Sequence, residues 1–155
     1  MALLKIVKFG DELLRKPSRP VTEITPRITR LLDDMIDTMR HHDGCGLAAV
    51  QVGVLRRIAV VEVEPGKVIE LINPRIIAYA GEQEEPEGCL SNPGRYGLVR
   101  RPASVTVRAT NRDGKDFEIT GHELLARALC HEIDHLDGKI YTDKQIRELD
   151  PEELK

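Results

Sequence analysis

Apolar residues recur at helical spacing in the first third of the chain. Thr25 and Pro26 supply an N-cap and a first-turn proline for a helix. The apolar stripe that follows consists of Ile28, Leu31, Leu32, Met35, Ile36 and Met39. His41 and His42 come near its end, where a partial positive charge suits the helix dipole. We therefore predict an amphipathic helix that starts at Pro26 and ends at Asp43-Gly44.

A second helical pattern lies near the C-terminus. Thr120 and Glu123 have the spacing of a capping box. The positions expected to pack inward are Leu124, Leu125, Ala128, Leu129, Ile133 and Leu136. Gly138 is a natural helix stop. A helix this apolar is predicted to lie buried between sheets.

The middle of the chain contains runs of β-branched residues separated by turn signals, and this pattern predicts strands. The expected strands are residues 58–63, 68–72, 75–80, 104–110 and 117–119. Turns are expected at 64–67 and at 111–114, and the second of these would close an antiparallel hairpin. Residues 143–149 are expected to form a short final helix. Helices and antiparallel strands together predict an α+β fold.

Length and composition are those of one globular domain. The 155 residues are 41% apolar and 32% charged, so residues 1–155 are predicted to form a single catalytic domain. A net charge of −3 without a basic run argues against nucleic-acid binding. No apolar run suggests a membrane span, and the N-terminal residues do not resemble a signal peptide. Three cysteines, an odd number, favour a reducing compartment and a cytoplasmic location.

The segment His131-Glu132-Ile133-Asp134-His135 carries the clearest chemical signal. Two histidines four residues apart on a helix project from one face, so both can bind one divalent metal ion. Glu132 lies beside that ion, where it can take a proton from a bound water molecule. This H-E-x-x-H arrangement gives two ligands and a base, but a catalytic site needs a third ligand.

The third ligand is expected upstream. One metalloprotease group has a histidine at the position of Tyr141, and the remaining downstream acids belong to a short charged tail with Glu148, Glu152 and Glu153. Cys130 directly precedes His131 and would point away from it on a helix. Cys45 lies between glycines, and Cys89 lies in a segment of tight-turn and polar residues. A thiolate there would complete a Cys/His/His set with an open fourth position.

Three segments, in order, resemble motifs of the peptide deformylase family. Residues 44–51 resemble its G-x-G-L-A-A-x-Q motif, and residues 87–91 read E-G-C-L-S as the family does. Residues 130–136 resemble Q-H-E-x-D-H-L, with Cys130 where glutamine is common. The resemblance covers nearly the whole chain. It implies small antiparallel sheets packed around a central metal-binding helix.

The resemblance also implies a metal-dependent hydrolase. Cys89, His131 and His135 would bind one divalent ion, with Fe(II) expected natively and Zn, Ni or Co able to occupy the same site. Metal-bound water would attack the formyl carbonyl of an initiator formyl-methionine. Glu132 would act as the general base and then as the acid.

Further residues are assigned to the substrate by the same resemblance. The Gln51 side chain and the Leu90 backbone N–H would stabilise the oxyanion. The Cys45-Gly46 segment would pair with the substrate main chain. Helix spacing, not the resemblance, selects Leu124 and Ala128 for the methionine pocket, because they lie seven and three positions before His131 and share its face. The implied partners are N-formylmethionyl peptides, with the ribosome as a further candidate.

Some positions depart from the family pattern. Arg127 stands where an apolar residue is usual, and we expect its guanidinium to extend to the pocket rim. Tyr96 stands where many members have arginine, and Arg95 precedes it, so substrate contacts beyond methionine are expected to differ. We also expect Glu87 to pair with Arg101 and hold the loop that carries the cysteine ligand.

Two other functions compete with this interpretation. A general metalloendopeptidase of the HExxH type needs a long cleft and a histidine or glutamate as third ligand. A structural metal-binding domain needs a closed four-ligand site, and no fourth cysteine or histidine recurs at suitable spacing.

Overall fold

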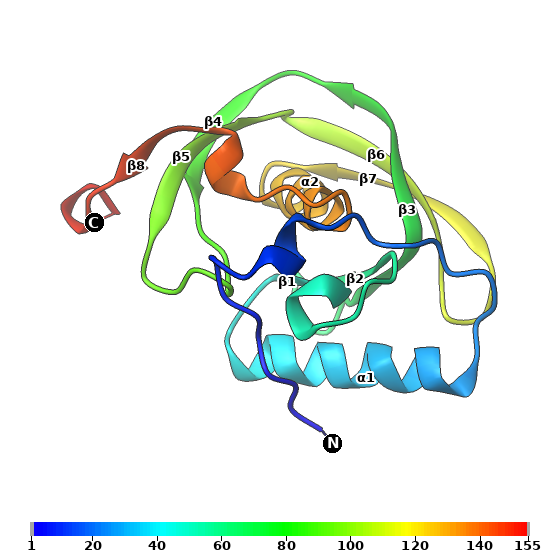
Figure 1. The fold of residues 1–155 in the computed structure, drawn as a ribbon. Helices are drawn as coiled ribbons and strands as arrows, with labels where there is room; N and C mark the ends of the chain where they lie inside the picture. Colours follow the sequence, from blue (N-terminus) through cyan, green and yellow to red (C-terminus); the bar gives the residue numbers. More distant parts are fainter. Residues whose placement is uncertain (1, 155) are drawn as a thin grey trace.

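Helix α2 (Leu124–Leu136) occupies the centre of the fold, where Figure 1 shows it end-on. The computed structural model describes residues 2–154. A five-stranded antiparallel sheet, in the order β1-β2-β3-β6-β7, curves around α2, and a three-stranded sheet, β4-β5-β8, lies on another side. Helix α1 (Pro26–His41) covers the outer face of β1 and β2. This arrangement confirms the predicted α+β fold around a central helix.

The strands are β1 (Gly46–Ala48), β2 (Ile58–Val61), β3 (Ile69–Ala80), β4 (Gln83–Glu87), β5 (Tyr96–Arg101), β6 (Ser104–Thr110), β7 (Asp116–His122) and β8 (Gln145–Leu149). Short 3₁₀ turns are η1 (Glu12–Arg15), η2 (Ala49–Val52), η3 (Tyr141–Asp143) and η4 (Pro151–Leu154). No helix among residues 2–154 has the length and apolar character that a membrane crossing requires.

Strand β2 is buried on both faces, which explains its continuous apolar run. Ile58 and Val60 pack towards α1, whereas Ala59 and Val61 pack towards α2. All four side chains are fully buried. A strand covered by a helix on each side needs no alternation of apolar and polar residues. The same sheet thus separates two apolar clusters, and α2 is held in the inner one.

Strand β3 corrects the expectation of two separate strands. It runs without interruption through Asn73 and Pro74, with register shifts against β6 at this place. Asn73 has a φ of 53°, and its side-chain amide bonds both the N–H and the C=O of Val21. Asparagine tolerates this conformation, and proline donates no ladder hydrogen bond, so the strand bulges here without ending.

The start of α2 also differs from the prediction. Thr120 belongs to β7, and the next two residues still pair with β6. Glu123 is the N-cap, with a φ of 52° and no side-chain cap hydrogen bond, and its N–H donates to the Ala103 carbonyl. The predicted capping box was therefore wrong, because sheet pairing persists up to Glu123. Leu124, expected inside, is 52% exposed at the first turn.

The C-terminal segment forms a strand instead of the expected helix. Residues of β8 pair antiparallel with β5, from Tyr96 opposite Leu149 to Val99 opposite Gln145. Ile146 and Leu149 have helical spacing, but only Leu149 is buried, and Ile146 is 49% exposed. The exposed edge of β5 offers backbone hydrogen bonds that the weak apolar stripe of an isolated helix cannot match.

Candidate active site and metal centre

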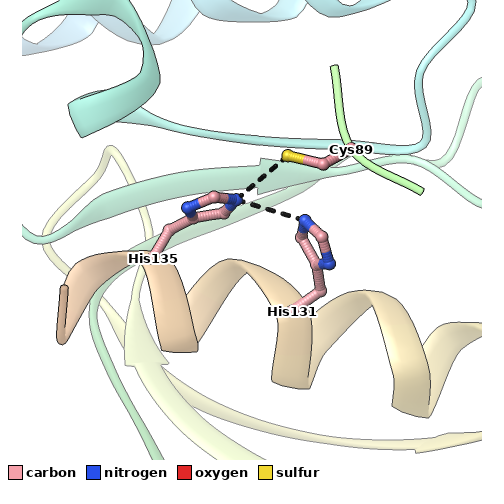
Figure 2. Close-up of side chains that lie close together, drawn as sticks. All are labelled: Cys89, His131 and His135. Carbon is pink, nitrogen blue, oxygen red and sulfur yellow. Dashed lines mark hydrogen bonds between the residues drawn. The ribbon is translucent and has the colours of Figure 1, made fainter. Parts of the chain in front are cut away.

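Three ligand-type side chains converge beside α2. His131 and His135 lie on successive turns of this helix, and Cys89 lies in the loop between β4 and β5 (Figure 2). The His135 Nε2 atom is 3.3 Å from the Cys89 Sγ atom and 3.2 Å from the His131 Nε2 atom. Within residues 2–154, the ligand atoms of this group all lie within 4.8 Å of one another. One sulfur and two nitrogens at this spacing form a suitable donor set for one divalent metal ion.

The charges around the two histidines favour a cation. His135 is fully buried, and burial lowers its pKa well below the ordinary value, so its ring is neutral as a metal ligand requires. Burial alone would lower the pKa of His131, but negative groups around it, led by Glu132, raise it instead. Surroundings that attract a proton in this way also attract a metal cation. The residues therefore fit the ion that the donor set implies.

Glu87, at the end of β4, orients the His131 ring. The His131 Nδ1–H group donates to Glu87 Oε2 at 2.6 Å, which leaves Nε2 as the nitrogen that faces Cys89 and His135. Arg101 donates to both carboxylate oxygens, at 3.1 and 2.6 Å, and this confirms the predicted Glu87–Arg101 pair. Although burial opposes it, these hydrogen bonds and charges hold the pKa of Glu87 well below its usual range.

Arg127 does not extend to the pocket rim as expected. It is 4% exposed, and its guanidinium donates to Glu87 Oε1 at 2.7 Å and to the Val99 carbonyl at 2.9 Å. Sequence reasoning missed this contact, although Arg127 lies four residues before His131 and hence on the same helix face. It also missed Asp134, which accepts a hydrogen bond from Arg101 at 2.6 Å.

Glu132 has the surroundings of a general base. It is 3% exposed, and its Oε1 atom has no hydrogen-bond partner among the described residues. Burial, with a further contribution from the Glu87 charge, raises the pKa of Glu132 to about 7, although His131 opposes the shift. A carboxylate with a pKa near neutrality can both accept and return a proton.

Gln51 lies at the other side of the cysteine loop and is 1% exposed. Its Oε1 accepts the Ala48 N–H at 2.9 Å, which fixes Nε2 as the atom that faces the loop. Nε2 donates to Ser91 Oγ at 3.1 Å and lies 3.4 Å from Cys89 Sγ. The predicted oxyanion donor is thus placed next to Cys89, the predicted cysteine ligand. Leu90, the other predicted donor, is the next residue in this loop.

A cavity of about 480 Å³ opens onto this group. Its lining includes all four residues predicted to bind substrate, which are Cys45, Gly46, Leu124 and Ala128, together with His131 and Glu132. Ala128 is buried, whereas Leu124 and Cys45 are exposed. The predicted pocket residues therefore surround one cleft that leads to the metal-ligand atoms. Cys130 is buried in the apolar cluster around α2, away from this cleft.

Tyr96 was not predicted as a pocket residue but lines the same cavity. Gly88 gives it room, because a Cβ atom at Gly88 would lie 2.6 Å from the Tyr96 ring. Arg95 forms an ion pair with Glu148 of β8. Tyr96 and Arg95, which depart from the family pattern, therefore have different partners. The Tyr96 ring packs against Gly88, whereas the Arg95 guanidinium pairs with β8.

Gly46 leaves the space that the Glu132 carboxylate occupies. A Cβ atom at Gly46 would collide with Glu132 Oε2, whereas one at Gly44 would meet only the end of the Leu90 side chain, at 2.7 Å. We expect Gly46→Ala to displace the carboxylate and lower kcat by about a hundredfold. Gly44→Ala is the matched control and should lose much less, since the Leu90 side chain can turn away. Equal turnover numbers for the two variants would contradict this role for Gly46.

Known proteins share this fold and its motifs. A family model described as polypeptide deformylase matches residues 3–151. A peptide deformylase of Caldanaerobacter subterraneus subsp. tengcongensis is 56% identical over 154 residues, which cover 99% of this chain and 96% of that protein. A peptide deformylase of Alkaliphilus metalliredigens is 59% identical over 148 residues, which cover 96% of this chain and 100% of that protein. The crystal structure of a peptide deformylase from Legionella pneumophila matches with a TM-score of 0.90 and 45% identity, covering 97% of this chain and 88% of that one. The chain therefore belongs to the polypeptide deformylase family.

Proposed function

We propose that Cys89, His131 and His135 hold the catalytic metal ion of this chain and that Glu132 is its general base. Family membership makes the chain a metal-dependent hydrolase that removes the N-formyl group from formylated nascent peptides. The alternative of a general endopeptidase is not favoured. The observation that carries the assignment of residues is the convergence of the three ligand atoms beside Glu132 at one cavity.

The proposed reaction is hydrolysis of the formyl amide bond. When bound, a divalent ion supplies a Lewis acid that polarises the carbonyl and lowers the pKa of a water molecule. Glu132 takes a proton from the attacking water as the new C–O bond forms. It returns that proton to the amine nitrogen as the C–N bond breaks, which gives formate and a free methionyl N-terminus.

Two donors are proposed for the carbonyl oxygen as it gains negative charge. The Gln51 Nε2–H₂ group is held in place by the hydrogen bond that its Oε1 accepts from the Ala48 N–H. The Leu90 backbone N–H follows Cys89 directly in the chain. Donors that are fixed before the reaction stabilise the developing charge without reorganising.

The substrate is proposed to lie along the cavity that Gly46 and Cys45 line. Its main chain would pair with this segment, which continues β1 at the edge of the five-stranded sheet. The methionine side chain would contact Leu124 and Ala128 of α2. A formyl group is the smallest acyl group, so we propose that it reaches the metal-ligand atoms more readily than larger acyl groups do.

Fe(II) is the proposed native ion, and Zn, Ni or Co would bind the same thiolate and imidazole ligands. The free state of all three cysteines supports a cytoplasmic location, where thiols stay reduced. The ribosome is a proposed partner, because its nascent chains carry the substrate. Residues 1–155 are proposed to act as one catalytic domain, which agrees with the span of the family match.

Formate release tests this proposal. Protein purified without oxygen and loaded with Fe(II) or Ni(II) is expected to release formate from formyl-Met-Ala-Ser. The matched acetyl-Met-Ala-Ser peptide should be cleaved far more slowly because its acyl group is larger. Full metal occupancy without formate would contradict the proposed function, and cleavage at an internal peptide bond would favour the endopeptidase instead.

A further inference from the structure

The Glu87 carboxylate joins two side chains of α2 that lie one helical turn apart. Its Oε2 atom accepts the His131 Nδ1–H group at 2.6 Å, and its Oε1 atom accepts Arg127 at 2.7 Å. Both residues lie on the same face of the helix because they are four positions apart. Each oxygen of the carboxylate thus meets one residue of α2.

Arg127 is also fixed to the three-stranded sheet. Its guanidinium donates to the Val99 carbonyl of β5 at 2.9 Å, and its side chain is 5% exposed. Burial of a charged guanidinium is unfavourable unless a carboxylate pairs with it, and Glu87 is that carboxylate. Arg127 therefore has one well-defined position between α2, β4 and β5.

Arg101 holds the two oxygens of Glu87 unequally, since its Nη2 atom is 2.6 Å from Oε2. Its Nε atom is 3.1 Å from Oε1, which is longer than the 2.7 Å contact of Arg127 with the same oxygen. Arg101 also divides its guanidinium between two acids, because it donates to Asp134 at 2.6 Å. Without Arg127, the Oε1 side of the carboxylate would keep only this longer hydrogen bond.

We propose that Arg127 is a positioning residue for the metal ligand His131. It holds the Glu87 carboxylate, so that Oε2 keeps the imidazole ring oriented with Nε2 towards Cys89 and His135. This inference rests on the proposed set of metal ligands. It assigns Arg127 to retention of the metal, whereas Leu124 and Ala128 on the same helix are assigned to the substrate.

Release of Co²⁺ from the loaded protein to a chelator tests the inference without any assay of activity. Loss of a group that orients a metal ligand typically lowers metal affinity by about ten- to a hundredfold. Arg127→Met removes the guanidinium, and we expect the lost affinity to appear as Co²⁺ release that is faster by about the same factor. The visible spectrum of bound Co²⁺ should change as well. Arg100→Met is the matched control. Arg100 of β5 also pairs with a glutamate of β4, Glu84, but this ion pair lies on the exposed surface.

The variants test the role of Arg127 and the set of proposed metal ligands separately. Release from folded Arg127→Met at the unmodified rate would overturn the role of Arg127. Arg127→Lys keeps the charge but loses the planar fork that reaches two acceptors, so it should release Co²⁺ at an intermediate rate. If Arg127→Met does not fold, Arg127→Lys tests the role of Arg127, and release at the unmodified rate would then overturn it. His135→Ala should retain no Co²⁺. Full retention of Co²⁺ by His135→Ala would reject the proposed metal ligands, whatever the role of Arg127.

Discussion

Glu132→Ala is expected to abolish formate release while the protein keeps its fold and its metal ion. Removal of a general acid and base lowers kcat by about a hundredfold to ten-thousandfold. Metal binding should persist because the proposed ligands are Cys89, His131 and His135, whose converging atoms do not include the Glu132 carboxylate. Formate release and metal content per chain, measured on one preparation, test both halves of the expectation.

The fold should survive this change for a reason visible at Glu132 itself. Its Oε1 atom makes no hydrogen bond among the described residues. Removing this oxygen therefore leaves no buried donor unpaired. Glu132→Gln keeps the shape of the side chain but not its basicity, and should lose turnover to a similar extent. Loss of metal from either variant would mean that Glu132 is a ligand, and unchanged turnover would mean that another group is the base.

Apolar periodicity predicted the elements whose burial is one-sided or complete. Helix α1 starts at Pro26 as its N-cap and proline indicated, and β6 spans the predicted Ser104–Thr110 and pairs with β7. The buried side chains of these elements are mostly apolar, with Thr38 of α1 as an exception. The sequence therefore carries the pattern that the core requires.

The three-stranded sheet was missed because its side chains are mostly polar. Strand β4 is acidic and largely exposed, and β5 carries Arg100 opposite Glu84. Cross-strand ion pairs and backbone hydrogen bonds hold such strands together, and neither gives a periodic signal along a single chain. The same sheet brings Val99 to Arg127. A residue expected at the pocket rim is thus buried by partners that lie far away in the sequence.

The candidate site was more predictable than the sheets because its chemistry is local. Two histidines on one helix face and the glutamate between them need only the geometry of α2. The proposed third ligand, in contrast, lies in a loop more than forty residues upstream, at Cys89. Its position followed from the family motif, since no periodic pattern distinguishes Cys89 from Cys45.

The three cysteines allow a matched test of that assignment. Cys89→Ala is expected to weaken metal binding more than a hundredfold and to remove activity, because loss of a direct ligand exceeds the effect of losing an outer contact. Cys45→Ala should keep the metal, since Cys45 lines the cavity without belonging to the group of ligand atoms. Cys130→Ala should also keep it and lose only some stability, as Cys130 is 4% exposed in the apolar cluster. Metal content after gel filtration and formate release distinguish the variants. Metal retained by Cys89→Ala but lost from Cys45→Ala would place the thiolate ligand elsewhere in the cleft.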